Sequence, residues 1–246
     1  MIPKVIHYCW FGGNPLPESA IKCIESWKKF CPDYEIKQWS EENYDINKIQ
    51  YVKEAYQEKK YAFVTDVARL DIIYHEGGIY LDTDVEIIKS LDQLLDNSLY
   101  LGMETTGRVN TGLGFGAEPK HKFVKDNLNL YADIPFVSNI TCVTYTTNML
   151  KRYGLRNRNE LQQLETILVL PTEYLCPLIL ETNRLKITEN TYSIHHYDMS
   201  WKDKKDNLEQ HTISSNYKTT ETLEPGKNIT TMTPGKLYPI MFKEIL

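Results

Sequence analysis

The residues best suited to chemistry in this chain are two acids that follow a short apolar run. Asp82 and Asp84 stand two positions apart, after the glycine pair Gly77-Gly78 and the run Ile79-Tyr80-Leu81. That run is typical of a buried strand. If the strand continues through the acids, both carboxylates point to one face, with Cα atoms roughly 6.6 Å apart. Two ionised carboxylates held this close need a cation, such as a divalent metal.

A second charged pair precedes the acids on a predicted helix. Apolar residues spaced three and four apart predict one buried helical face before the glycine pair. Asp66 and Arg69 are neighbours on this helix. Taken alone, an Asp-x-Asp predicts an acidic turn, and an Asp-x-x-Arg predicts a surface ion pair of little energetic weight. Found together, the two pairs resemble a nucleotide-sugar site.

These motifs resemble the signature of the DXD-containing sugar transferases of glycosyltransferase family 32. That family includes bacterial capsule and polysaccharide transferases and fungal mannosyltransferases, and it is related to the large clostridial glucosylating toxins. The resemblance covers about residues 1–202 and implies an α/β fold of the glycosyltransferase-A type, with a Rossmann-like nucleotide-binding sheet flanked by helices. Its other matching segments are Ile2-Pro3-Lys4-Val5-Ile6-His7, Trp10-Phe11-Gly12-Gly13, Ser26-Trp27, Pro32-Asp33-Tyr34, His195-His196 and Ser200-Trp201.

The resemblance also implies roles for the charged residues. Asp66 and Arg69 would hold hydroxyls of the donor sugar. Asp84 would bind a divalent metal, Mn²⁺ or Mg²⁺, because oxygen ligands suit both ions. Asp82 would reach the ribose or a water on the metal. All four residues are therefore expected in the catalytic site.

Further donor contacts are expected from residues outside the two charged pairs. Trp10 follows the first predicted strand and would stack on uracil, although a core tryptophan fits the sequence equally well. The remaining expected donor contacts are Tyr80, Asn110, Ser200 and Trp201.

Two adjacent histidines near residue 195 present a choice. Neighbouring side chains of an extended segment face opposite ways, so only one of His195 and His196 can face the site. A lone histidine is more often structural than a ligand, although imidazole is a common metal ligand. The resemblance favours His196 as the metal ligand, beside Ser200 and Trp201 over the pyrophosphate.

The remaining pattern indicates a scaffold of alternating strands and helices. Ser40-Glu41-Glu42-Asn43 has the composition of a helix start. The predicted strands are 5–11, 34–39, 99–103 and 168–171, and the predicted helices are 18–30, 48–60, 121–131 and 144–153.

The composition of the chain indicates which binding partners and which cellular compartment to expect. The chain has 246 residues, enough for one catalytic domain, and its net charge of −5 argues against nucleic acid. Its five irregularly spaced cysteines predict thiols in a reducing compartment. With no signal peptide or long apolar run, we expect a cytoplasmic protein. Residues 203–246 form a polar extension whose short apolar end leaves room for peripheral contact with the inner membrane face.

We therefore expect a metal-dependent retaining glycosyltransferase. Its donor would be a nucleoside diphosphate sugar, UDP-galactose or UDP-glucose first, with GDP-mannose open. Its acceptor would be a glycan or a lipid-linked oligosaccharide of bacterial polysaccharide biosynthesis, such as capsule or O-antigen. Two alternatives stay open: a haloacid-dehalogenase-like phosphatase with Asp82 as nucleophile, and a non-catalytic sugar-binding protein.

Overall fold

The computed structural model describes residues 1–179, 182 and 184–198. Ser200, Trp201 and the predicted extension 203–246 lie outside the described residues. Within the described part, no helix is both long and apolar enough to cross a membrane. The five cysteines all belong to the described part, and no disulfide joins them.

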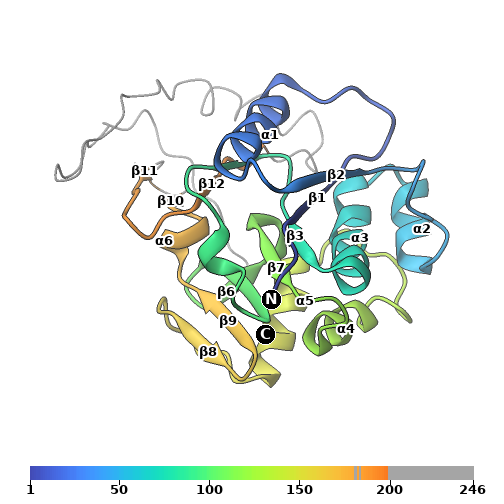
Figure 1. Ribbon diagram of the computed structural model, residues 1–246. Coiled ribbons are helices and arrows are strands. Elements are labelled where there is room, and N and C mark those ends of the chain that lie inside the picture. The colour runs from blue at the N-terminus through green and yellow to red at the C-terminus, as the bar shows by residue number, and fades with distance from the viewer. Residues whose placement is uncertain (180–181, 183, 199–246) are drawn as a thin grey trace.

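A mixed sheet forms the centre of the fold, in the order β2-β1-β3-β7-β5-β9-β8, with β6 paired to β5 (Figure 1). β1 runs parallel to β2 and β3, and β5 runs parallel to β9. β7 is antiparallel to both of its neighbours, β3 and β5. The strands are β1 Val5–Cys9, β2 Glu35–Trp39, β3 Gly78–Tyr80, β5 Leu99–Thr105, β6 Arg108–Asn110, β7 Phe115–Ala117, β8 Gln162–Leu164 and β9 Ile167–Leu170.

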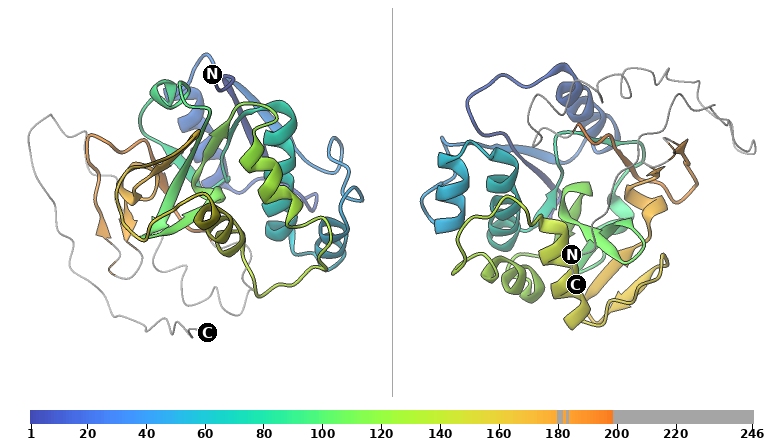
Figure 2. Two further views of the ribbon diagram at one scale, coloured as in Figure 1. Left: turned by 90° about the horizontal axis from the view of Figure 1, so that it is seen from below. Right: turned by 180° about the vertical axis from the view of Figure 1, so that it is seen from behind.

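Helices cover both faces of this sheet, and strand side chains alternate between two cores. On β5, Leu99 and Leu101 pack in one core while Tyr100 packs in the other. One core includes α1, and the other includes α2, α3, α4 and α5 (Figure 2). This arrangement confirms the predicted α/β class with a helix-flanked sheet. The helices are α1 Glu18–Phe30, α2 Gln50–Gln57, α3 Tyr61–Glu76, α4 Lys122–Asn129, α5 Cys142–Arg152 and the short α6 Thr172–Leu175.

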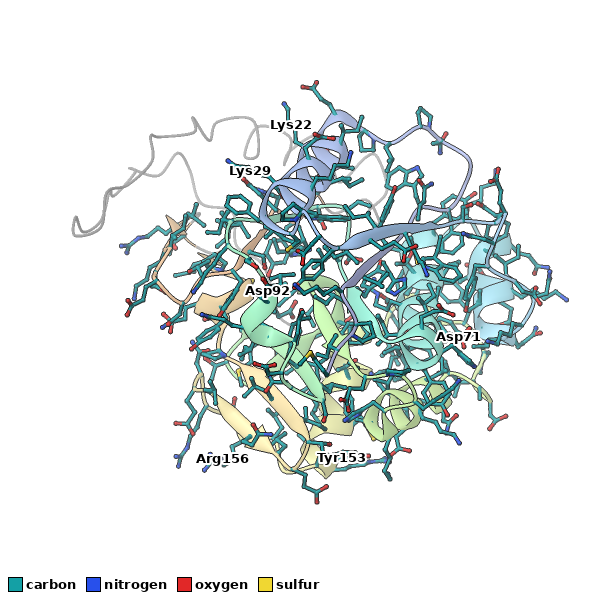
Figure 3. The ribbon with its side chains drawn as sticks, viewed as in Figure 1. Lys22, Lys29, Asp71, Asp92, Tyr153 and Arg156 are labelled. Carbon is teal, nitrogen blue, oxygen red and sulfur yellow. The ribbon has the colours of Figure 1, made fainter. Side chains whose placement is uncertain are left out.

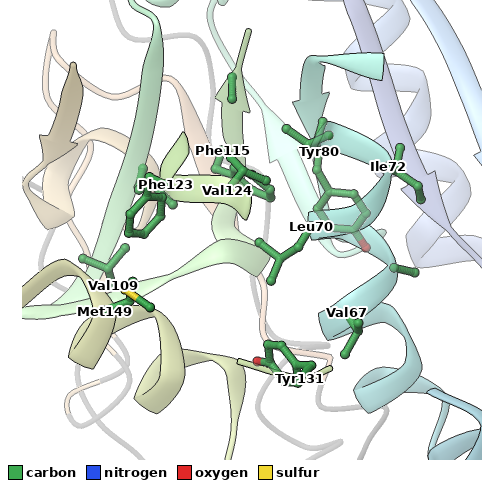
Figure 4. Packing of buried hydrophobic residues seen from close by; sticks show 14 of the residues in the cluster. Val67, Leu70, Ile72, Tyr80, Val109, Phe115, Phe123, Val124, Tyr131 and Met149 are labelled. Carbon is green, nitrogen blue, oxygen red and sulfur yellow. The ribbon is translucent and has the colours of Figure 1, made fainter. Parts of the chain in front are cut away.

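The two long helices next to the first strand differ in burial. α1 is amphipathic, and Lys22 and Lys29 lie on its outer side (Figure 3). α3 is central instead, and every residue from Phe63 to Ile73 is buried. Figure 4 shows Leu70 of α3 among the sheet residues Tyr80 and Phe115. Because α3 is buried all round, its charged residues must find partners inside the protein.

The glycine pair ends α3 and starts β3, as the sequence predicts. Gly77 and Gly78 have φ of 69° and 92°, in the region that favours glycine. A Cβ on Gly78 would lie 2.7 Å from the Val5 carbonyl oxygen and 3.0 Å from His7 Nε2. The close approach of β3 to β1 therefore requires glycine at this position.

Two local predictions are wrong. The strand does not continue through the acids, because β3 ends at Tyr80 and a turn closes with the Val85 N–H donating to the Asp82 carbonyl at 3.1 Å. After that turn, β4 Val85–Ile87 pairs with β12 Ser193–His195 in a separate sheet. The predicted helix start at Ser40 is also a turn, in which Asn43 Oδ1 accepts from the Ser40 N–H at 2.8 Å.

Candidate active site

Sheet direction brings the predicted site residues to one edge. Because β7 is antiparallel to both β3 and β5, these two strands run parallel, as do β1 and β9 with their partners. Their carboxyl ends therefore meet, and ligands of open α/β sheets bind at such an edge. Trp10 follows β1, Asp82 follows β3, and Glu104 lies near the end of β5.

Arg69 is the centre of the site. Its side chain is 4% exposed, and its Nη2 lies 3.1 Å from Asp66 Oδ1 and 3.1 Å from Asp82 Oδ1. Its Nε donates to the Thr65 carbonyl at 3.1 Å, and its Nη1 donates to Thr111 Oγ1 at 3.3 Å. Asp66 and Arg69 are therefore not a surface ion pair, and Arg69 forms a buried bridge from α3 to Asp82 at the end of β3. A guanidinium with this many fixed partners is held in one orientation.

Asp82 is held by contacts on several sides. The Tyr80 hydroxyl donates to Asp82 Oδ1 at 2.9 Å, and the Arg69 guanidinium lies over the Tyr80 ring, 4.9 Å from its centre. Gly112 closes another side, because a Cβ there would lie 2.2 Å from Asp82 Oδ2. Asn110 fixes this glycine by accepting from its N–H at 2.7 Å. The structure therefore brings the predicted Tyr80 and Asn110 to Asp82.

Asp66 is a buried acid. Burial raises the pKa of its carboxyl to about 6, and Asp82 acts in the same direction while Arg69 opposes both. The first N–H of α5, from Cys142, donates to the carboxylate. The Cys142 sulfur also lies 3.9 Å from Arg69 Nη1 and 3.8 Å from Asn110 Oδ1. Cys142 was not predicted at the site, and no local motif marks it, since only the packing of α5 brings it there.

The second acid has a histidine beside it, and this histidine is not the predicted one. His195 Nε2 lies 3.2 Å from Asp84 Oδ1, whereas His196 Nε2 lies 2.9 Å from Glu86 Oε2. The cause is the register of β12 on β4, which pairs His195 with Val85 and turns its side chain inward. His195 is 6% exposed. The expected placement of His196 beside the acids is therefore corrected to His195.

The pKa values of Asp82 and Asp84 shift in opposite directions. Burial raises the pKa of Asp82, and Asp84 reinforces this shift while Arg69 opposes it. Burial alone would also raise the pKa of Asp84, but the His195 imidazole and the Asp198 N–H lower it to about 2. Asp84 is therefore the acid whose negative charge is better stabilised.

These residues fit a divalent cation. One ligand atom each from Asp82, Asp84 and His195 can be chosen so that all three lie within 4.8 Å of one another. Carboxylate oxygens suit Mn²⁺ and Mg²⁺, and an imidazole nitrogen is a common ligand of transition metals. The other nitrogen of His195, Nδ1, is buried and has no hydrogen-bond partner among the described residues.

Trp10 lies at the expected sheet edge and is half-buried. Its indole N–H donates to the Asn14 carbonyl at 2.6 Å, and its ring packs partly against the core that contains α1. This placement agrees with both sequence interpretations, so its stacking on a base stays a prediction.

Comparison with known proteins finds a family match in the first half of the chain. Residues 17–101 match the family model described as "Glycosyltransferase sugar-binding region containing DXD motif". This stretch is similar to the DXD-containing sugar-binding region of glycosyltransferases. It holds both charged pairs, Asp66 with Arg69 and Asp82 with Asp84. The resemblance predicted from these motifs is thereby confirmed.

Two curated relatives of this DXD-containing chain come from a yeast. Inositol phosphoceramide mannosyltransferase 1 of Schizosaccharomyces pombe is 30% identical over 134 residues, which are 50% of this chain and 40% of the relative. Inositol phosphoceramide mannosyltransferase 3 of the same yeast is 33% identical over 123 residues, 46% of this chain and 33% of the relative. The chain thus matches less than half the length of these two relatives.

Solved glycosyltransferases resemble the DXD-containing chain more distantly. The PaToxG glycosyltransferase superposes with a TM-score of 0.48 at 19% identity, covering 62% of this chain and 69% of that one. The galactosyltransferase LgtC superposes with a TM-score of 0.40 at 14% identity, covering 88% of this chain and 97% of that one.

Proposed function

We propose that this chain is a glycosyltransferase that moves a sugar from a nucleoside diphosphate donor to an acceptor hydroxyl. The observation that carries the proposal is the buried bridge of Arg69 between Asp66 and Asp82, with Asp84 and His195 next to it at the ligand-binding edge of the sheet. Burying charged groups costs free energy, and buried charged groups with perturbed pKa values cluster at functional sites. The match to a DXD-containing sugar-binding region supports the same function.

In this proposal the two charged pairs bind different parts of the donor, one the diphosphate through a cation and the other the sugar. Asp82, Asp84 and His195 would hold a divalent cation, Mn²⁺ or Mg²⁺, which supplies positive charge opposite the leaving diphosphate. Arg69 and Asp66 bind hydroxyls of the sugar and fix the ring for attack. Each of these side chains is oriented by buried partners, so little rearrangement is needed on binding.

The stereochemistry and the substrates are finer proposals. We propose retention of the anomeric configuration, as the predicted family resemblance implies. The names of the two yeast relatives describe mannosyl transfer to a lipid, inositol phosphoceramide. Their likeness supports a GDP-mannose donor and a lipid acceptor for this chain, beside the predicted UDP-galactose or UDP-glucose donor and a lipid-linked oligosaccharide.

The phosphatase alternative needs Asp82 as a nucleophile. Arg69 and Tyr80 engage Asp82 Oδ1, so Oδ2 is the oxygen available to a cation or to phosphorus. The match to a sugar-binding region favours the transferase over the phosphatase. We therefore keep the phosphatase as an outcome of the test.

The test is release of nucleoside diphosphate from a panel of UDP-glucose, UDP-galactose and GDP-mannose, with Mn²⁺ or Mg²⁺ and with a chelator. We expect one donor to turn over, the chelator to stop the reaction, and Asp84→Asn to abolish it. The exposed acid Asp33 provides a control, and Asp33→Asn should keep full activity. Hydrolysis of a generic phosphate ester that depends on Asp82 would contradict the proposal, as would metal-dependent donor binding without any turnover.

A further inference from the structure

Tyr197 follows the site histidines and has an unusual backbone. Its φ is 57°, in the left-handed region that bulky L-residues rarely adopt. Glycine or asparagine would occupy this conformation more easily. A tyrosine held there must be stabilised by contacts of its side chain, and strained residues of this kind gather at functional sites.

The bend at Tyr197 returns the chain to Asp84. Before the bend, the His196 N–H donates to the Asp84 carbonyl at 2.9 Å. After it, the Asp198 N–H donates to Asp84 Oδ2 at 3.0 Å. Both flanking amides therefore fix one residue, the second acid of the pair, and an extended backbone at 197 would carry the second amide away from the carboxylate.

The Tyr197 side chain stabilises this bend through contacts with buried residues. Its ring meets the His195 ring edge-on, with centres 4.1 Å apart. Its hydroxyl lies 2.9 Å from Cys176 Sγ, a buried atom just after α6. The ring thus supports His195 from one side while Asp84 contacts His195 Nε2 from another, at 3.2 Å.

We propose that Tyr197 is a positioning residue that sets Asp84 and His195 in place for the divalent cation. The inference rests on the proposed function, because it assumes that these two residues bind the metal. Tyr197 itself contacts no metal in this account. It acts through the edge contact with His195 and through the backbone bend that delivers the Asp198 N–H to Asp84.

The experiment measures Mn²⁺ binding to the full chain, by the loss of the free-ion signal in electron paramagnetic resonance, without donor. Tyr197→Gly permits the bend but removes the ring, and Tyr197→Leu removes the aromatic edge. We expect each to weaken Mn²⁺ binding at least tenfold. Tyr197→Phe keeps the ring on His195 and should stay within threefold of the wild type.

A matched control relieves the same backbone strain elsewhere. Glu165 has φ of 50° and is exposed in the turn between β8 and β9. Glu165→Gly should leave Mn²⁺ binding unchanged. Thermal unfolding without metal, measured for every variant, identifies a variant that fails to fold; if Tyr197→Gly does so, Tyr197→Leu decides the question.

The two ways of failing are distinct. If Asp84→Asn loses Mn²⁺ while Tyr197→Gly and Tyr197→Leu bind it like the wild type, the positioning role is overturned and the metal site stands. If the wild type and Asp84→Asn bind Mn²⁺ equally, the metal site falls, and the role of Tyr197 falls with it.

Discussion

Arg69 and Asp82 form a buried ion pair, with Nη2 and Oδ1 3.1 Å apart, that ties the middle of α3 to the carboxyl end of β3. The same Nη2 lies 3.1 Å from Asp66 Oδ1, so one guanidinium contacts two carboxylates. The pairing joins a helix that is buried all round to the edge where ligands of α/β sheets bind. The ion pair therefore fixes the side chains of the site to the packed core.

The first prediction concerns the forked shape of the Arg69 guanidinium. Arg69→Lys keeps the charge, but a single ammonium cannot reproduce the fixed, forked contacts of the guanidinium. We expect kcat/KM for the donor to fall at least about 100-fold, or roughly 2.7 kcal/mol of transition-state stabilisation. The control is Arg156→Lys, which alters an exposed pair with Glu160, 3.3 Å apart. An active Arg69→Lys enzyme would show that the bridge is structural only.

Gly112 provides a steric test of the position of Asp82. A Cβ in Gly112→Ala would lie 2.2 Å from Asp82 Oδ2 and 3.1 Å from Arg69 Nη1. The carboxylate must shift, so we expect at least a tenfold lower kcat/KM with a folded protein. Gly154→Ala is the control, because its Cβ meets nothing within 4 Å although φ is 96°. It should cost about 1 kcal/mol of stability through backbone strain and leave donor turnover unchanged.

His7 gives the protein a pH-dependent stability that is independent of the site chemistry. Burial lowers its pKa to about 4, and the neutral ring is fixed between two partners. Trp39 Nε1–H donates to Nδ1 at 3.1 Å, so Nε2 carries the proton and donates to the Gly77 carbonyl at 3.0 Å. Between about pH 4 and 6.5 the unfolded chain binds more protons at this residue, so stability falls as pH falls.

We expect His7 to contribute roughly 3 kcal/mol to the free energy of unfolding. This contribution is present above pH 6.5 and is lost by about pH 4. Urea unfolding at several pH values should show this slope in the wild type. In His7→Gln the same part of the slope should disappear, because glutamine does not titrate. Equal slopes in both proteins would mean that His7 is not buried in its neutral form.

The sequence predicted the elements whose signals are local. Periodic apolar residues and a following proline gave α1 within its observed bounds, Glu18–Phe30, and the glycine pair correctly marked the end of α3. The acid pair and Arg69 were also found from local motifs. Their burial as one bridge could not be read from the chain, because it depends on the packing of α3 against the sheet.

The choice of histidine and the missed cysteine both depend on contacts between segments far apart in the sequence. Whether His195 or His196 faces Asp84 depends on the register of β12 against β4, two strands more than a hundred positions apart. The contact of Cys142 with Asp66 depends on where α5 packs. Neither contact leaves a periodic pattern in the sequence that would have predicted it.

The most direct test of the proposed sugar-transfer site compares its two histidines. The measurement is Mn²⁺-dependent release of nucleoside diphosphate from the active donor by His195→Ala and His196→Ala. With His195 beside Asp84 and His196 paired to Glu86, we predict at least a 100-fold loss for His195→Ala and less than a threefold change for His196→Ala. Full activity of His195→Ala, or a selective loss in His196→Ala, would contradict the site described here.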